Sequence, residues 1–353
     1  MAGVRVVFAA VMRRQTSFLA IEAAGAGPPG STGPADPWLD PAHHLRVAAA
    51  AARTGADLLL FPDSFGAPDD PSAPALDAVA VAARVAPVVP RIGLAPTVTV
   101  THTEPFHVSK AIATLDLVSG GRAGWQPAVS RTAREAALFG RKPAAAAPEL
   151  WREAAEAIEV VVRLWDSWED DAVIRDAATG RYVDRDKLHY IDFVGEFFSV
   201  KGPAITPRSP QGHPLIVLRG DEPEALPVAA AWADVVRVAT TDARERVRAA
   251  VAAAGRDPDA VAVLLDIRAD RAPEVLVDAV GAAVRDASMD GVTLIPGPDA
   301  AALDVVADEV VPRLLAAGLR EPDSAGPTLR DRFGLPRADN YFTSGDFTAG
   351  AVS

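Results

Sequence analysis

Along this chain, eight short apolar segments alternate with eight longer segments that have a helical pattern. The short segments are rich in branched apolar side chains, as expected of strands that are buried on both faces of a parallel sheet. The expected strands are Val4–Ala10, Asp57–Pro62, Arg91–Thr97, Arg122–Gln126, Pro214–Arg219, Asp234–Ala239, Val261–Ile267 and Gly291–Ile295. The expected helices are Pro41–Thr54, Ser72–Val85, Pro105–Val118, Pro148–Trp168, Glu222–Trp232, Asp242–Ala253, Pro273–Ala287 and Asp299–Ala316. Strict alternation predicts a parallel sheet, and eight units close a (β/α)8 barrel.

Size and composition fit one such barrel. The chain has 353 residues, and a (β/α)8 barrel needs about 250 plus insertions. Its formal net charge of -12 argues against nucleic-acid binding. The absence of cysteine excludes disulfides, thiolate metal sites and a cysteine nucleophile. The apolar start Val4–Met12 is too short to span a bilayer and lacks the layout of a signal peptide. We expect a single cytoplasmic domain over residues 1–353.

Three segments fall outside the repeat. Gly25–Asp40 is rich in glycine and proline and is expected to form a long loop after the first strand. Residues 170–213 are too many for a plain connection, so we expect an excursion from the barrel, with a small hairpin around Tyr190–Val200. From about residue 318 the chain has little helical pattern, and we expect a tail that wraps the barrel exterior.

Functional residues of a (β/α)8 barrel lie where its strands end and in the loops that follow. Asp63 directly follows the second expected strand. Thr97, Thr99 and Thr101 alternate at the end of the third, which places them on one side of an extended backbone. These residues are candidates for a binding site. The competing interpretations are a turn-capping aspartate and the ordinary strand preference of threonine.

Cationic side chains also follow the strands. Arg219 and Arg237 end two neighbouring strands, where two guanidinium groups could hold a phosphate or a substrate carboxylate, or could only neutralise nearby acids. His102 and His107 follow the third strand, and either could act as an acid–base group or contact a ligand. No histidine has convincing metal-ligand spacing with carboxylates, so we predict no metal site.

Four strings carry a family resemblance. They read Ala-Thr-Leu-Asp-Leu-Val-Ser-Gly-Gly-Arg-Ala-Gly-Trp-Gln at 113–126, Leu-Trp-Asp-Ser-Trp-Glu-Asp-Asp-Ala at 164–172, Gly-Glu-Phe-Phe-Ser-Val-Lys-Gly-Pro at 195–203, and Pro-Arg-Ser-Pro-Gln-Gly at 207–212. The chain resembles the bacterial-luciferase-like flavin monooxygenases, in particular the branch that degrades nitrilotriacetate, EDTA and dibenzothiophene sulfone. The resemblance recurs at residues 252–258 and 328–336. That family has the (β/α)8 barrel fold.

The resemblance implies where a flavin ring would lie. Asp63, Thr97, Gln126 and Ser130 match family positions close to the flavin. Gln126 stands where relatives have asparagine, so it keeps an amide that reaches one methylene further. Val129 replaces a family threonine, which removes a hydrogen-bond donor. The ring site is therefore expected to be partly kept.

The resemblance also implies an altered phosphate site. Relatives hold the flavin phosphate with a Gly-Ser-Ser loop, an anion site at a helix N-terminus. Here Gly220 is kept, but Asp221 and Glu222 replace the serines, and Trp151 stands where relatives have a tyrosine. Carboxylates repel a phosphate unless a cation intervenes, and these two also suit the start of the next helix. We expect them to weaken FMN binding, with Arg219 and Arg237 as a possible compensation.

Two functions follow from these observations. The first is a two-component monooxygenase that takes reduced FMN, or a deazaflavin, from a separate flavin reductase and oxygenates a small organic substrate. The second is a flavin-free or catalytically altered homologue, either a partner subunit of an active chain or a non-redox enzyme. Relatives carry a helical insertion that is missing after Ile267, which favours the second. The kept ring residues favour the first, which is our prediction. We expect a homodimer, or a heterodimer with a homologue.

Overall fold

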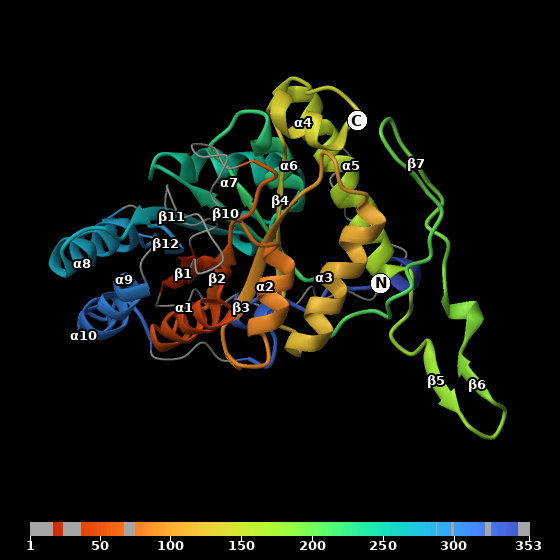
Figure 1. The fold of residues 1–353 in the computed structure, drawn as a ribbon, viewed down its shortest axis with the longest axis horizontal. Coiled ribbons are helices and arrows are strands. Elements are labelled where there is room, and N and C mark those ends of the chain that lie inside the picture. The colour runs from red at the N-terminus through yellow and green to blue at the C-terminus, as the bar shows by residue number, and fades with distance from the viewer. Residues whose placement is uncertain are drawn as a thin grey trace, which may run out of the picture.

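Eight parallel strands close into a barrel in the order β1-β12-β11-β10-β9-β4-β3-β2 (Figure 1). The computed structural model describes residues 17–23, 37–66, 75–286, 288–297, 300–321 and 326–344. The barrel strands are β1 (Phe18–Glu22), β2 (Leu58–Phe61), β3 (Gly93–Thr99), β4 (Gly124–Ala128), β9 (Leu215–Arg219), β10 (Val235–Val238), β11 (Ala262–Arg268) and β12 (Gly291–Ile295). Each neighbouring pair is parallel. The (β/α)8 barrel predicted from the alternation is confirmed.

Helices pack around the outside of this barrel (Figure 1). The helices of the described residues are α1 (Pro41–Arg53), α2 (Ala78–Val85), α3 (Pro105–Ser119), α4 (Ala133–Phe139), α5 (Ala147–Asp166), α6 (Ala225–Trp232), α7 (Ala243–Ala253), α8 (Pro273–Gly281), α9 (Ala300–Val305), α10 (Val311–Ala316), α11 (Leu329–Arg332) and α12 (Tyr341–Ser344). Two π-helical segments, η4 (Ala282–Asp286) and η5 (Val306–Val310), continue α8 and join α9 to α10. No helix among the described residues is long and apolar enough to cross a membrane.

The first barrel strand differs from the prediction. The position expected for Val4–Ala10 is taken by β1, which pairs with both β12 and β2 and so closes the barrel. Val4–Ala10 lies outside the described residues, as does most of the expected loop Gly25–Asp40. Both N-terminal segments are short apolar runs, and periodicity alone does not decide which of two such runs enters a sheet.

The barrel interior changes from apolar to polar along the strands. Side chains that point inward recur every second residue. One buried interior cluster contains Ala20, Leu58, Leu60, Ala95, Leu215, Val217, Val235 and Leu264. Two residues further along five of these strands stand Glu22, Thr97, Arg219, Arg237 and Asp266. The alternation therefore places a polar layer at the carboxyl end of the barrel, above an apolar one.

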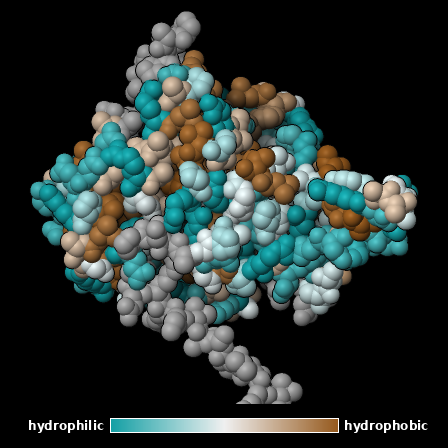
Figure 2. Space-filling view, turned by 90° about the horizontal axis from the view of Figure 1, so that it is seen from below, coloured by the Kyte–Doolittle hydropathy of each residue, from teal (hydrophilic) through white to brown (hydrophobic). Residues whose placement is uncertain are grey.

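The amino-terminal end of the barrel is closed by residues from the end of the chain. Phe333 stacks on Phe18 at the base of β1, with ring centroids 4.3 Å apart and an interplanar angle of 13°. Leu329 is fully buried in the same cluster. Figure 2 shows one face of the molecule, on which hydrophobic side chains form separate patches among hydrophilic ones. The functional residues of a (β/α)8 barrel lie at the opposite end, where this chain has its polar layer.

Two hairpins leave the barrel between α5 and β9 and extend to one side of it (Figure 1). Strands β5 (Val173–Asp176) and β6 (Arg181–Val183) form one, and β7 (Phe193–Val194) and β8 (Ser199–Val200) form the other. The second hairpin lies within the segment where one was expected. Its turn is anchored to α5, because the Glu156 carboxylate accepts backbone N–H bonds from Glu196 at 2.7 Å and Phe197 at 2.9 Å.

Candidate functional site

One part of the barrel mouth carries alternating charges, and we call it the charged side. Its members are Glu22, Arg219, Asp221, Arg237 and Asp266. Arg237 is 2% exposed. Its guanidinium forms a two-pronged pair with Asp266, at 2.9 and 3.0 Å, and also contacts Glu22 at 2.5 Å and the Gln126 side-chain oxygen at 3.1 Å. Such a buried cation is compensated by the carboxylates around it and has little surface left for a substrate.

Arg219 extends the charged side toward solvent. Its half-exposed guanidinium donates to Asp266 at 2.9 Å and to Asp221 at 3.2 Å. Asp221 in turn accepts the backbone N–H of Ala239 at 2.7 Å, which ties the loop after β9 to the end of β10. Of the two roles considered for Arg219 and Arg237, the geometry therefore favours neutralisation of nearby acids.

Glu222, the next residue of this loop, is held by two donors that we call the anion clasp. The Arg131 guanidinium, from the loop after β4, forms an ion pair with the Glu222 carboxylate. The indole N–H of Trp151, from the first turns of α5, donates to the same carboxylate oxygen at 3.2 Å. Trp151 is buried, whereas Arg131 and Glu222 are each 42% exposed at their side chains. A carboxylate of the chain thus fills an anion-binding position at the barrel mouth.

The opposite part of the mouth is formed by β3 and β4, and we call it the hydroxyl side. Its hydroxyl groups belong to Thr97, Thr99, Thr101 and Ser130. Gln126 donates to the Thr97 oxygen at 3.1 Å, and the backbone N–H of Ser130 donates to Thr101 at 2.9 Å. The hydroxyls of Thr99 and Ser130 are buried and have no hydrogen-bond partner within the described residues. An unpartnered buried hydroxyl is costly, and a bound ligand is one way to satisfy it.

Asp63 lies beside the hydroxyl side, two residues after the end of β2. Its carboxylate accepts the backbone N–H of Ala78 at 2.9 Å and so fixes the start of α2. Burial raises the pKa of the Asp63 carboxyl above its ordinary value. Asp63 and Thr97 line an open cavity of about 910 Å³ that continues between α2 and α3. The turn-capping role and the site role considered for Asp63 are therefore compatible.

The two candidate histidines lie in different surroundings. His102 is buried and stacks on Phe139, with ring centroids 4.8 Å apart. Burial lowers the pKa of the His102 imidazole, and the positive charges of Lys142 and Arg141 lower it further. His107 is exposed on the first turn of α3, where it lines the same large cavity. The surroundings of His102 thus favour its neutral imidazole over the charged form.

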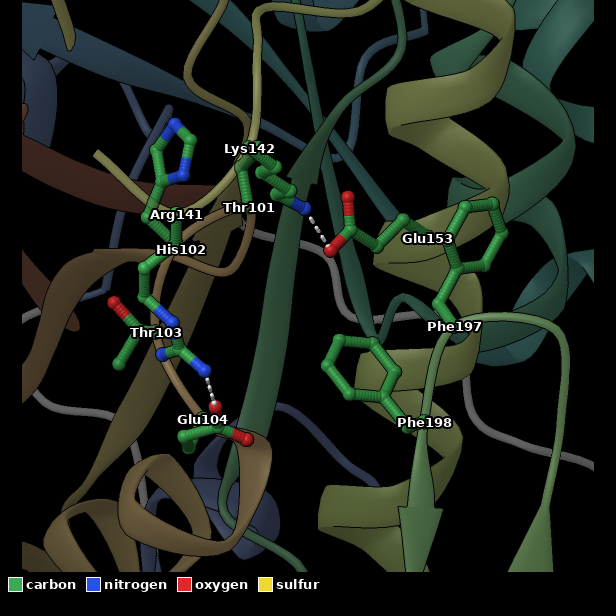
Figure 3. A pocket seen from close by; sticks show the side chains of 9 residues that line it. All are labelled: Thr101, His102, Thr103, Glu104, Arg141, Lys142, Glu153, Phe197 and Phe198. Carbon is green, nitrogen blue, oxygen red and sulfur yellow. Dashed lines mark hydrogen bonds and ion pairs between the residues drawn. The ribbon is translucent and has the colours of Figure 1, made fainter. Parts of the chain in front are cut away.

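A second cavity of about 230 Å³ borders His102 (Figure 3). On one side of it, Lys142 pairs with the Glu153 carboxylate, and on another Arg141 pairs with Glu104 at 2.9 Å. Its further lining residues are Thr101, Thr103, Phe197 and Phe198. The two phenyl rings come from the turn of the second hairpin; the Phe198 ring points toward the ion pairs, and the Phe197 ring lies beside α5 next to Glu153 (Figure 3). The cavity therefore combines an apolar wall with two ion pairs.

The two ends of a flavin, its ring and its phosphate, would meet different surroundings in this chain. At the hydroxyl side, the unpartnered Thr99 and Ser130 hydroxyls fit the polar edge of a ring. At the expected phosphate end, Glu222 occupies the clasp with a negative charge. Gly220 does not leave space for a phosphate there. A Cβ at this residue would lie 2.7 Å from Cγ1 of Val236, so the space beside Gly220 is filled by the protein interior. The ring end fits a flavin, whereas the phosphate end does not fit a phosphate.

Several residues of the barrel mouth could not be identified from the sequence pattern. Glu22 ends an apolar run, and a charged residue at the end of a strand is the pattern that could have indicated its place in the mouth. Arg131 gave no signal, because its partner Glu222 is distant in sequence and only the fold brings them together. Helix α4 was also missed, although Thr132 and Glu135 form a capping box at its start. Among the described residues, no group of three or more His, Asp or Glu side chains could hold a metal ion.

Comparison with known proteins gives a family for this architecture. The family model described as luciferase-like monooxygenase matches residues 16–318. Dibenzothiophene-sulfone monooxygenase of Rhodococcus erythropolis is 34% identical over 241 residues, 63% of this chain and 53% of that protein. The chain thus matches about half the length of this relative. One of the subunits of pristinamycin IIA synthase of Streptomyces pristinaespiralis is 30% identical over 299 residues, 84% of this chain and 89% of that protein.

A solved structure shares the fold. EDTA monooxygenase from Chelativorans sp. BNC1 superposes with a TM-score of 0.80, covering 91% of this chain and 99% of that chain at 22% identity. At this identity the likeness shows the fold alone.

Proposed function

Since the chain belongs to the luciferase-like monooxygenase family, we propose that it is the oxygenating component of a two-component flavin-dependent monooxygenase. It takes a reduced flavin from a separate reductase and oxygenates a small organic substrate. The observation that carries this proposal is the pair of unpartnered buried hydroxyls, Thr99 and Ser130, at the end of the barrel where such enzymes act. The redox chemistry belongs to the flavin. The chain binds and orients the flavin and the substrate, and it excludes water from them.

We assign the ring-binding role to the hydroxyl side and its neighbours. Asp63, Thr97, Gln126 and Ser130 border one region of the mouth, and Gln126 is fixed there by Thr97 and Arg237. Arg237 thereby acts as a positioning residue and does not itself bind substrate. His102, whose pKa is lowered mainly by burial, is our acid–base residue.

The substrate pocket in this proposal is the cavity beside His102 (Figure 3). Its volume of about 230 Å³ lies just below the range of about 300–1,000 Å³ that is typical of ligand pockets, so the substrate would be small. Phe197 and Phe198 would contact its apolar part. The cations Arg141, which is 64% exposed, and Lys142, which is 36% exposed, would attract a polar or anionic end.

We also propose association with a second chain of this fold through α2 and α3. The large cavity between these helices is bordered by Val118, which is 55% exposed, and Leu117 beside it is 43% exposed. Apolar side chains on a helix pair are a feature of protein–protein contacts. The partner is either a second copy or a homologous chain, and the synthase relative is itself one of the subunits of its enzyme. A cytoplasmic location stays a prediction.

An anaerobic titration with reduced flavins tests the proposed function. We expect saturable binding of at least one reduced flavin. We further expect that, with a reductase and isotope-labelled oxygen, one labelled atom enters the product of an accepted substrate. A reduced deazaflavin serves as the comparison ligand. If no flavin or deazaflavin binds in either redox state, the chain is not the oxygenating component, and a flavin-free partner of an active homologue becomes the better interpretation.

A further inference from the structure

The anion clasp combines donors from two separate elements on one carboxylate of the same chain. Arg131 follows β4, Trp151 lies on α5, and Glu222 follows β9. Both donors meet the same oxygen of Glu222, Arg131 through its ion pair and Trp151 at 3.2 Å. Guanidinium and N–H donors of this kind also bind phosphate oxygens. The clasp therefore has the chemistry of an oxyanion site, and Glu222 is its internal occupant.

The charge around the clasp is unfavourable for a second anion. Asp221 precedes Glu222, and its carboxylate is already committed to Arg219 and to the Ala239 N–H. Within the described residues, Arg131 is the cation that contacts Glu222. A phosphate entering here would bring one to two negative charges beside a carboxylate that already holds this cation. It would have to displace Glu222 from both donors or accept like-charge repulsion.

We propose that Glu222 selects the flavin by excluding its 5′-phosphate, so that this chain binds riboflavin in preference to FMN. The inference rests on the proposed function, since it concerns the flavin of that same site. The ring end stays as described, with the hydroxyls of Thr99 and Ser130 available. A flavin that ends in a neutral ribityl hydroxyl leaves the clasp closed on Glu222 and meets no repulsion.

The test compares FMN and riboflavin binding to the wild-type protein and to Glu222→Gln, by quenching of flavin fluorescence and, for reduced flavins, by anaerobic titration. Gln keeps an oxygen that accepts from Trp151 and Arg131 but removes the charge. The matched control is Glu159→Gln, which neutralises one acid of an ion pair with Arg163 on α5, with side chains 25% and 29% exposed. Thermal unfolding of each variant checks that it is folded.

We expect wild-type protein to bind riboflavin at least about tenfold more tightly than FMN. Glu222→Gln should tighten FMN binding by about tenfold and change riboflavin binding by less than about twofold. Glu159→Gln should change neither. A wild-type preference for FMN, or a flavin ratio that Glu222→Gln leaves unchanged, would overturn the inference and leave the proposed function standing. If neither the wild type nor a variant binds FMN, riboflavin or a deazaflavin in either redox state, both the inference and the proposed function are overturned.

Discussion

On the charged side of the barrel mouth, both arginines meet carboxylates of the same chain. On the hydroxyl side, two buried hydroxyls meet no partner within the described residues. Both sides are built from strand ends of one barrel, so the difference lies in the side chains and not in the backbone. The charged side is closed by its own contacts and should contribute mainly to stability. The hydroxyl side is incomplete and should contribute mainly to binding.

The largest effect is expected from breaking the charged side at its centre. Arg237→Met removes the cation shared by Glu22 and Asp266, and the Asp266 side chain is only 6% exposed. The variant leaves Glu22 without its cation and leaves Asp266 with Arg219 alone, which should lower the free energy of unfolding by about 3–5 kcal/mol, measured by urea denaturation. The control is Arg246→Met, whose ion pair with Asp242 is exposed and should contribute less than about 1 kcal/mol. Equal losses in the two variants would show that the charged side is not a stabilising network.

A smaller loss is expected at the cavity beside His102. Lys142→Met leaves the Glu153 carboxyl, 8% exposed, without its cation. The free energy of unfolding should fall by about 2 kcal/mol at neutral pH. Lys187→Met is the control, because its partner Asp171 is 72% exposed and stays hydrated.

The loss of stability in the Lys142→Met variant should also depend on pH. Burial already raises the pKa of Glu153, although Lys142 opposes this, so removing Lys142 raises it further. An acid whose pKa is higher in the folded than in the unfolded state binds more protons when folded. The variant should therefore lose stability relative to wild type as pH rises above about 4.3, the ordinary glutamate value. A difference between the two proteins that is constant from pH 4 to pH 8 would contradict this.

The fold was largely predictable because strand burial leaves a local signal. Seven expected strands overlap those observed, and the error concerned Val4–Ala10 against Phe18–Glu22, two apolar runs that pattern alone does not separate. The mouth was predictable in position, since the barrel rule selects strand ends. Its contacts were not, because which carboxylate meets Arg237 or Arg131 depends on strand order and register, and these pairs are far apart in sequence.

The hydroxyl side gives the sharpest separation of binding from stability. Ser130→Ala removes a hydroxyl that makes no hydrogen bond within the described residues. It should change the free energy of unfolding by less than about 0.5 kcal/mol and weaken flavin binding about five- to tenfold, the value of one hydrogen bond. Ser119→Ala should lower the free energy of unfolding and leave flavin binding unchanged, because that buried hydroxyl is already bonded to Asp116 and Arg122. A Ser130 variant that is destabilised while its flavin affinity is unchanged would assign the hydroxyl to folding.

The smallest effect is expected from the titration of His102. Its pKa is lowered, first by burial, so below about pH 6.5 the unfolded chain takes up a proton that the folded chain does not. The free energy of unfolding should therefore fall as pH drops from 8 toward 5, and His102 should account for part of that slope. His102→Phe keeps a ring to stack on Phe139 but cannot titrate, so its slope should be shallower than that of wild type.

Urea denaturation of both proteins at several pH values measures this slope, with low and high salt as a further control. The contribution from burial does not depend on salt, whereas the contributions of Lys142 and Arg141 are screened by it. A difference between His102→Phe and wild type that persists in high salt assigns the shift to burial and supports a neutral imidazole beside the substrate cavity. Identical slopes in the two proteins would show that His102 is equally ready to take a proton in both states, and its assignment as the acid–base residue would lose its basis.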